Sequence, residues 1–364
     1  MSARVVVAMS GGVDSSIAAA ILREQGYDVI GIAMRLASSG HAGGNGRQVC
    51  CSYEDFEDAR RVAERMDFPF YVVDLRDEFR SRVIDNFVDE YLAGRTPNPC
   101  VMCNREIKFA RLWSRAQCLG ADFVATGHYS RIDRDSDGRY HLFRAADDAK
   151  DQSYFLFAMT QAELARTMFP LGEMTKPEVR AQARALGLAV ADKPESQEIC
   201  FVPDRDYAQF VASNADPARI RSGQIVDGDG RVLARHDGIH RFTVGQRRGL
   251  GVAAGEPLYV RDIDAELGRV TVGRREELTA RGLCATQISL VDDRMAAGGV
   301  RQIEVKIRYR HPTVPATLRM VARDRAEVRF TGDSCPAVTP GQVCVFYDRD
   351  EVLGGGFIER ALEA

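Results

Sequence analysis

The stretch Val5-Val6-Val7-Ala8-Met9-Ser10-Gly11-Gly12-Val13-Asp14-Ser15-Ser16 predicts a strand, a glycine turn and the start of a helix in immediate succession. Val5 to Met9 is a short, β-branched apolar run, which is typical of a strand covered on both faces. Gly11 and Gly12 allow backbone conformations that residues with side chains rarely adopt, and they let backbone amides approach an anion. The helix that follows presents unpaired amides and a positive dipole end to this turn, so phosphate suits the place best.

The loop matches neither of the two commonest phosphate-binding motifs, GxxxxGK[ST] and GxGxxG. Ser-Gly-Gly-x-Asp-Ser at 10–15 resembles the pyrophosphate loop of the ATP pyrophosphatases, enzymes that adenylate a substrate carbonyl oxygen and release pyrophosphate. An ordinary strand-to-helix turn is the less favourable alternative, because the match falls in the right strand, turn and helix context. The residues expected to bind the nucleotide here are Ala8, Met9, Ser10, Gly11, Gly12, Val13, Asp14 and Ser15.

Strands and helices alternate after the loop, which predicts an α/β fold with a doubly wound parallel sheet. Strands are expected over 27–34, 70–73 and 123–125, and helices over 55–66, 77–93 and 175–186, with 38–46 as a mobile loop. Ligands bind beyond the carboxyl ends of such strands, where Met34 and Gly127 follow two of them. Both residues are therefore expected to flank an adenine, although a core position is an equally good interpretation of Met34.

Composition sets wide limits on function. The chain has 364 residues, a net charge of −3 and nine cysteines. This length favours two or three domains, and the charge gives no global argument for nucleic acid binding. There is no apolar run of about 18 residues and no signal peptide pattern, so we expect a cytoplasmic protein without membrane contact and with reduced thiols.

Arg95 to Phe109 is the second informative stretch. Pro97 and Pro99 are expected to end the preceding helix and stiffen a loop. Asn104 would cap a helix over 105–119, which places Cys103 at the amino end, where the dipole favours a thiolate. Cys100-x-x-Cys103 also permits a metal site, but structural zinc commonly takes four ligands, and no second C-x-x-C or H-x-x-x-H pair is expected to supply the other two. The neighbouring pair Cys50-Cys51 has an atypical spacing for supplying the other two, and no bound metal is expected.

Several blocks carry a closer resemblance to a known family. They are 10–15, 98–109, 126–129, 150–156, 196–201, 243–251 and 353–356. In this order, over nearly the whole chain, they resemble the bacterial tRNA-specific 2-thiouridylases. The set is specific, although no block beyond the first is decisive alone.

The resemblance implies three domains. Residues 1–210 would form the pyrophosphate-loop catalytic domain, 211–280 a small β-rich domain and 281–364 a C-terminal β-barrel that contacts tRNA. Short strand patterns agree with this, with a hairpin over 223–233 and strands that include 241–244, 258–260 and 269–272. A helix is expected over 205–212, and further strands over 303–307, 317–321, 326–330 and 343–347 suit the barrel.

The chemistry implied by the resemblance replaces O2 of the wobble uridine in a tRNA anticodon with sulfur. ATP would adenylate O2, with Asp14 helping to hold Mg²⁺. Cys200 would carry the incoming sulfur as a persulfide, and Cys103 would be its partner thiol. Either Cys103 releases hydrosulfide from the persulfide, or the persulfide attacks C2 directly, and both routes leave a disulfide for a reductant to reset. A cysteine desulfurase or a relay protein would supply the sulfur to a monomeric enzyme.

The tRNA-binding residues implied by the resemblance are Asn98, Pro99, Cys100, His128, Lys150, Asp151, Gln152, Arg308, Tyr309 and Gln342. A flipped uridine would lie near the first of these and His128. Some relatives carry an aspartate at the position of Cys100, so the acid or base is unassigned here, with Glu195 the nearest alternative.

Two other functions remain open at this point. A pyrophosphate-loop synthetase that transfers nitrogen would share the fold without needing Cys103 or Cys200. A metal-bound RNA-binding module with a vestigial nucleotide loop would need no ATP.

Overall fold

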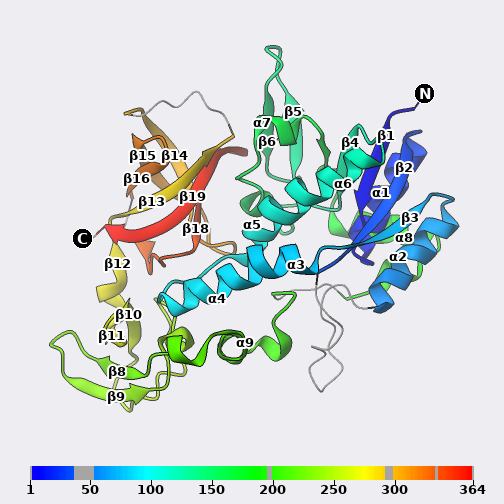
Figure 1. Cartoon of the computed structure of the whole chain (residues 1–364). Coiled ribbons are helices and arrows are strands. Elements are labelled where there is room, and N and C mark those ends of the chain that lie inside the picture. The colour runs from blue at the N-terminus through cyan, green and yellow to red at the C-terminus, as the bar shows by residue number, and fades with distance from the viewer. Residues whose placement is uncertain (1, 37–52, 195–198, 292–297, 333–334, 363–364) are drawn as a thin grey trace. The chain divides into compact units, whose positions relative to one another are not determined.

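A computed structural model describes residues 2–36, 53–194, 199–291, 298–332 and 335–362. The expected mobile loop over 38–46 and Glu195 lie outside these residues. Figure 1 shows the helices and strands of the chain, which divides into two compact units. Unit 1 holds Met1–Val83, Cys100–Arg205 and Asp350–Val352, and unit 2 holds Ile84–Pro99, Asp206–Arg349 and Leu353–Ala364. The predicted three-domain boundaries stay a prediction.

Unit 1 is built on a parallel sheet, as predicted. Its order is β3-β2-β1-β4-β7, with β1 at Arg4–Ala8, β2 at Asp28–Arg35, β3 at Phe70–Asp74, β4 at Phe123–Thr126 and β7 at Thr167–Met168. The strand order reverses at β1, which pairs with β2 on one side and β4 on the other. A reversal of this kind opens a crevice at the carboxyl end of the strand, where the predicted phosphate loop begins.

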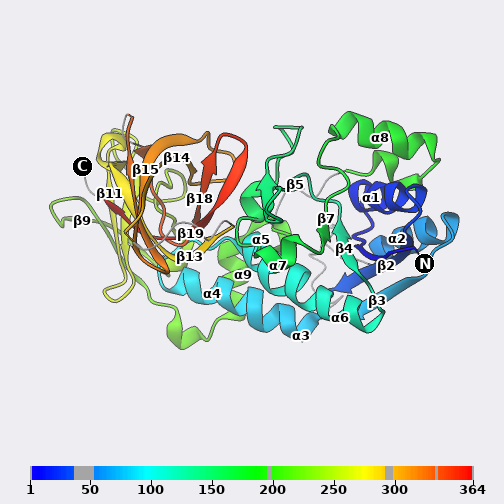
Figure 2. The same cartoon turned by 90° about the horizontal axis from the view of Figure 1, so that it is seen from above.

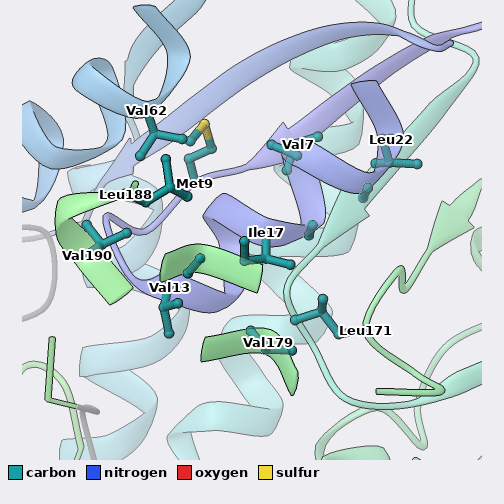
Figure 3. Packing of buried hydrophobic residues seen from close by; sticks show 14 of the residues in the cluster. Val7, Met9, Val13, Ile17, Leu22, Val62, Leu171, Val179, Leu188 and Val190 are labelled. Carbon is teal, nitrogen blue, oxygen red and sulfur yellow. The ribbon is translucent and has the colours of Figure 1, made fainter. Parts of the chain in front are cut away.

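Helices cover this sheet and fix the loop through apolar packing. They are α1 (Val13–Glu24), α2 (Tyr53–Arg65) and α8 (Lys176–Ala185), which Figure 2 shows from a second direction. Ile17 of α1 and Val179 of α8 are both fully buried in one cluster with Met9 (Figure 3). Both helices bury an apolar face there, so the residues on each side of the loop are held by the core.

The start of α8 follows the predicted cap. Thr175 donates to the Glu178 carboxylate from its backbone nitrogen at 2.7 Å and from Oγ1 at 2.8 Å. Pro177 lies in the first turn, where its missing N–H costs nothing.

The predicted helix start at Asn104 is wrong. The helix begins with α5 at Pro99–Met102, continues through a π-helical segment at Cys103–Arg111 and ends as α6 at Leu112–Cys118. Pro99 suits the first helical position, since its fixed φ matches a helix, and this outweighs an asparagine cap further on. Cys103 therefore lies one turn inside the helix. A second π-helical segment, Arg80–Ile84, joins α3 (Arg76–Phe79) to α4 (Asp85–Leu92) within the predicted helix over 77–93.

A hairpin and several short helices complete unit 1. Strands β5 (Arg131–Arg134) and β6 (Tyr140–Phe143) pair with each other, and β6 also pairs with Glu351–Val352, the start of β19. His141 lies between two carboxylates, with Nδ1 at 2.7 Å from Glu351 Oε1 and Nε2 at 3.1 Å from Asp135 Oδ2. The short helices are η4 (Ser153–Phe155), α7 (Gln161–Leu164), η5 (Ala189–Asp192) and η6 (Pro203–Arg205).

Unit 2 contains a small sheet with the order β10-β11-β8-β9. Its strands are β8 (Gly223–Val226), β9 (Val232–His236), β10 (Tyr259–Asp264) and β11 (Arg269–Gly273), and α9 spans Tyr207–Asn214. The predicted strand over 241–244 is wrong, because a 3₁₀ turn at Ile239–Arg241 leads into irregular chain there. Phe242 and Val244 are nevertheless buried in the core, which explains their strand-like pattern.

The predicted C-terminal β-barrel is confirmed. Its strands are β13 (Gly282–Leu290), β14 (Val300–Lys306), β15 (Val314–Ala322), β16 (Arg325–Phe330), β18 (Val343–Asp348) and β19 (Glu351–Leu362). Their order is β13-β16-β15-β14-β18-β19, and β13 pairs with β19 to close the barrel. Closure leaves these strands without free edges around an apolar interior.

Candidate active site

The loop between β1 and α1 has the geometry of an anion site. Gly12 is the residue before the first helical turn, and no side chain of the described residues caps this end of α1. The first backbone amides of α1 are therefore available to a ligand, and the helix dipole favours a negative charge there. Ser10, at the mouth of the loop, is exposed.

Two glycines are required where predicted. Gly11 has φ of +71°, and a Cβ atom on it would lie 2.2 Å from the carbonyl oxygen of Asp55 in α2. A Cβ atom on Gly127 would lie 2.7 Å from the backbone nitrogen of Ser15. Both distances are far shorter than van der Waals contact. The α2 backbone therefore lies directly against Gly11, and the Gly127 backbone lies directly against the start of α1.

Serine hydroxyls fix the shape of the loop from inside. Ser15 Oγ accepts from the backbone nitrogen of Ser10 and donates to the carbonyl of Gly12, both at 3.1 Å. Ser16 Oγ donates to the same carbonyl at 2.9 Å. These bonds hold the turn in one conformation before any ligand arrives.

Asp14 is engaged by two buried side chains. Lys176 Nζ donates to its two carboxylate oxygens at 2.7 and 2.8 Å, and the Tyr129 hydroxyl donates to Oδ1 at 2.7 Å. A magnesium ion on Asp14 would have to compete with the ammonium group, so this carboxylate fits the predicted magnesium-holding role poorly.

The remaining predicted nucleotide residues lie in or beside the core. Ala8, Met9, Val13 and Met34 are buried, with Met34 at the carboxyl end of β2. Burial agrees with the core interpretation of Met34, and its contact with an adenine stays a prediction.

The two predicted catalytic thiols both belong to unit 1. Cys103 is buried, Cys200 is half-buried and Cys100 is exposed. The Phe79 and Phe201 rings make an edge contact with centroids 5.6 Å apart, which anchors the chain directly after Cys200. The convergence of Cys103 and Cys200 stays a prediction. Since the dipole effect is confined to the first turn, it supports a thiolate at Cys103 less than the sequence suggested.

His128 follows Gly127, whose backbone lies against the phosphate loop, and the His128 side chain is buried. Its Nδ1 lies 2.7 Å from Thr126 Oγ1, and its Nε2 lies 3.5 Å from Lys108 Nζ. Desolvation, together with the Lys108 charge, lowers the pKa of His128 well below its usual value. The ring is therefore neutral near pH 7 and can accept a hydrogen bond.

Comparison with known proteins decides the family. A model described as a tRNA methyl transferase HUP domain matches residues 3–204, one described as a tRNA methyl transferase PRC-barrel domain matches 209–274, and one described as an aminomethyltransferase beta-barrel domain matches 280–358. The tRNA-specific 2-thiouridylase MnmA of Geotalea uraniireducens (strain Rf4) is 55% identical over 364 residues, which cover 99% of this chain and 96% of that protein. The chain belongs to the tRNA-specific 2-thiouridylase family. The 2-thiouridylase of Geobacter metallireducens is 54% identical over 362 residues, covering 99% of this chain and 97% of that protein.

One solved structure with similarity to this 2-thiouridylase family member is distant in sequence. A complex of a 4-thiouridine synthetase with RNA and ATP is 17% identical, covers 58% of this chain and 50% of that chain, and has a TM-score of 0.38.

Residues predicted to bind tRNA in unit 1 are partly committed to internal contacts. Asp151 is buried and accepts from the backbone of Ala145 at 3.2 Å and of Ser153 at 3.1 Å. The Gln152 side chain accepts from the backbone nitrogen of Tyr129 at 3.0 Å, next to His128. Lys150 is half-buried. The first two residues are therefore engaged in internal hydrogen bonds, and RNA contact by any of the three stays a prediction.

The predicted residues in unit 2 show a similar pattern. Gln342 Nε2 donates to the carbonyls of Thr96 at 3.0 Å and Pro97 at 3.1 Å. Asn98 and Pro99, which follow directly, are buried. Gln342 thus holds the segment that precedes α5.

Arg308 and Tyr309 also make contacts within the protein. One guanidinium nitrogen of Arg308 donates to Ala337 O at 2.9 Å and Thr339 Oγ1 at 2.5 Å. The Lys306 ammonium lies 5.6 Å from the centre of the Tyr309 ring. Contact of either predicted residue with tRNA stays a prediction.

The sequence analysis missed three features. Lys176 and Lys193 contact the loop from positions more than 160 residues further along the chain, and no local pattern signals such contacts. His236 and His240 form a buried H-x-x-x-H pair, so the expectation that the chain has no such pair is wrong. The described residues contain no group of three or more possible metal ligands. In the same parts of the chain, no helix is long and apolar enough to cross a bilayer.

Proposed function

We propose that this chain is an ATP-dependent enzyme that replaces O2 of the wobble uridine of a tRNA with sulfur. The observation that carries the proposal is the phosphate loop at 10–15, an uncapped helix start held rigidly at the carboxyl end of β1. Cys103 and Cys200 belong to the same compact unit as this loop. A loop of this shape supports nucleotide chemistry, and thiols supply the sulfur chemistry that the relatives' names describe.

The first step makes a poor leaving group into a good one. The uridine O2 attacks the α-phosphorus of ATP, the bond to the β-phosphate oxygen breaks, and pyrophosphate leaves. The amides that open α1 would hold the phosphates and stabilise the developing charge. Sulfur then attacks C2, and AMP departs with the former O2 oxygen.

Two routes balance the sulfur transfer. In one, the Cys103 thiolate attacks the Cys200 sulfur of the persulfide, forms a Cys103–Cys200 disulfide and releases hydrosulfide, which attacks C2. In the other, the terminal persulfide sulfur attacks C2 first. Cys103 then attacks the Cys200 sulfur, which frees the thiouridine and leaves the same disulfide. Either way, a two-electron reductant must restore both thiols.

The magnesium ion is proposed to bind together with the nucleotide. Mg²⁺ is commonly held by substrate phosphates and water with few protein ligands. Because Lys176 already donates to both oxygens of Asp14, we propose that Asp14 orders the loop and that the ion is bound mainly by the triphosphate.

The remaining partners are proposals of the same kind. A persulfide donor, either a cysteine desulfurase or a relay protein, would load Cys200 in the cytoplasm. In unit 2, Arg308, Tyr309, Gln342, Asn98 and Pro99 would contact tRNA or shape the surface that does, and in unit 1 Cys100 and the Lys150–Gln152 segment would do the same. Cys100 is exposed, and we propose it as a reserve thiol.

One experiment tests the proposal directly. The protein is incubated with unmodified tRNA, ATP, Mg²⁺ and a persulfide source, and the nucleosides are analysed by mass spectrometry. We expect 2-thiouridine, lost in Cys103→Ser and Cys200→Ser and retained in the control Cys118→Ser, whose thiol is exposed in another part of the unit.

Other outcomes would support other functions. Full turnover in both serine variants would favour a nitrogen-transferring synthetase. A methylated product, which has a different mass from a thiolated one, would favour the activity in the family model's description. Stoichiometric zinc without ATP–pyrophosphate exchange would favour an RNA-binding module.

A further inference from the structure

Lys193, from outside the phosphate loop, donates a hydrogen bond to the loop backbone. Its ammonium donates to the carbonyl oxygen of Gly11 at 3.1 Å, to Asp55 Oδ1 at 2.8 Å and to Asp58 Oδ2 at 2.6 Å. Only 17% of the Lys193 side chain is exposed, and its two carboxylate partners in α2 are exposed by 11% and 21%. An ammonium has three hydrogens, so these three acceptors match its donors.

The bond to Gly11 sets the direction of a functional amide. The peptide between Gly11 and Gly12 is planar, and its carbonyl and N–H groups point in opposite directions. Fixing the carbonyl on Lys193 therefore turns the Gly12 N–H away from α2, at the uncapped start of α1. Without that bond, the Gly11 peptide could rotate and replace this donor with a repulsive carbonyl.

We propose that Lys193 is a positioning residue for the ATP phosphates. It acts through the Gly11–Gly12 peptide and does not itself touch the nucleotide. The inference rests on the proposed function, since it assigns a cause to ATP affinity at the same loop.

The fold holds Lys193 firmly enough for this role. Arg180 of α8 donates to the Ala191 carbonyl at 2.6 Å and to the Lys193 carbonyl at 3.1 Å. Val190, three residues earlier, is buried in the core that supports the loop. The lysine backbone is thus fixed from α8 while its side chain reaches the loop.

Lys193 also separates two carboxylates on neighbouring turns of α2, so its removal has a structural effect as well. Asp55 and Asp58 would repel each other in Lys193→Met and destabilise the protein. Changing both to asparagine removes that repulsion but does not restore a donor to Gly11. The informative comparison is therefore K193M/D55N/D58N against the reference D55N/D58N, which keeps the lysine.

The test measures ATP binding and steady-state kinetics on these full-length variants. We expect the triple variant to bind ATP roughly ten- to a hundredfold more weakly than the reference, the usual effect of losing a charge-assisted hydrogen bond. The KM for ATP should rise while the KM for tRNA stays within about twofold. Melting temperatures that agree between the two variants would show that both are folded. In the same D55N/D58N background, Lys193→Arg should bind ATP more tightly than Lys193→Met, because arginine restores part of the donor.

The outcomes separate this inference from the proposed function. If the triple variant binds ATP within about twofold of the reference, Lys193 does not position the loop and the inference is overturned. If the unchanged protein neither binds ATP nor thiolates tRNA, the proposed function itself fails.

Discussion

Removing the charge of Lys176 should destabilise unit 1 by an amount that its surroundings determine. Lys176→Met keeps most of the apolar stem but leaves the Asp14 carboxylate with one hydrogen bond, from Tyr129. The lysine side chain is 8% exposed and the Asp14 side chain 32% exposed. Breaking a fully buried pair costs about 3–5 kcal/mol. Because water screens the partly exposed Asp14, we expect a loss of about 2–3 kcal/mol in the free energy of unfolding.

Urea denaturation can assign this loss to the correct unit. The chain has one tryptophan, and Trp113 lies in α6 of unit 1. Its fluorescence therefore reports the unfolding of the unit that holds the Lys176–Asp14 pair. A change in the midpoint without a change in slope would be a change in stability.

Two variants complete this test. The double variant K176M/D14N removes both charges and should lie within about 1 kcal/mol of the unchanged protein. Arg184→Met breaks an exposed pair on the same helix, with side chains 54% and 78% exposed, and should cost less than about 0.5 kcal/mol. If K176M is no less stable than R184M, the pair contributes nothing, and the argument that it orders the loop is refuted.

Three further predictions concern single residues. Gly11→Ala should abolish ATP binding, measured by titration, because its Cβ would overlap the Asp55 carbonyl at a positive φ. For His141, desolvation lowers the pKa, but the two carboxylate partners raise it by a larger amount, so the pKa is raised overall. Unit 1 should therefore lose stability as pH rises from about 6.5 through this raised value, and His141→Gln should lose that slope in Trp113-monitored unfolding. Burial raises the pKa of Cys344 to about 12, so it should resist iodoacetamide in the native protein, by peptide mass spectrometry, while Cys118 reacts.

Local sequence patterns were sufficient for the central part of the fold. The apolar run before Gly11 and the helical pattern after Gly12 could be interpreted without distant residues, and β1 and α1 appear there. The alternation of strands and helices predicted the parallel sheet, because connections in such sheets follow a restricted topology. The cap of α8 at Thr175 was equally local.

Errors arose where two local rules competed. Asn104 is a good cap in isolation, but Pro99 begins the helix earlier, and the Asn104 side chain instead donates to the Phe155 carbonyl at 3.1 Å. Phe242 and Val244 alternate like a strand but are buried in irregular chain. A buried apolar pattern records which side faces the core and does not by itself require a ladder partner.

The two lysines at the loop could not be predicted, for a different reason. Lys176 and Asp14 are 162 residues apart, and Lys193 and Gly11 are 182 apart. In sequence, each lysine looks like an ordinary charge beside a helix or a turn. Only the folding of α8 and η5 onto α1 brings their ammonium groups to the loop.

These contacts together restrict the loop from several directions. The Asp55 backbone excludes any side chain at Gly11, the Gly127 backbone lies against Asp14 and Ser15, and the two lysines hold one carboxylate and one carbonyl. A loop ordered in this way loses less conformational freedom when a phosphate binds, so more of the binding energy remains for the transition state. We therefore infer that the two lysines assist nucleotide binding indirectly. Both donate hydrogen bonds to the loop and so fix the shape that a phosphate would meet.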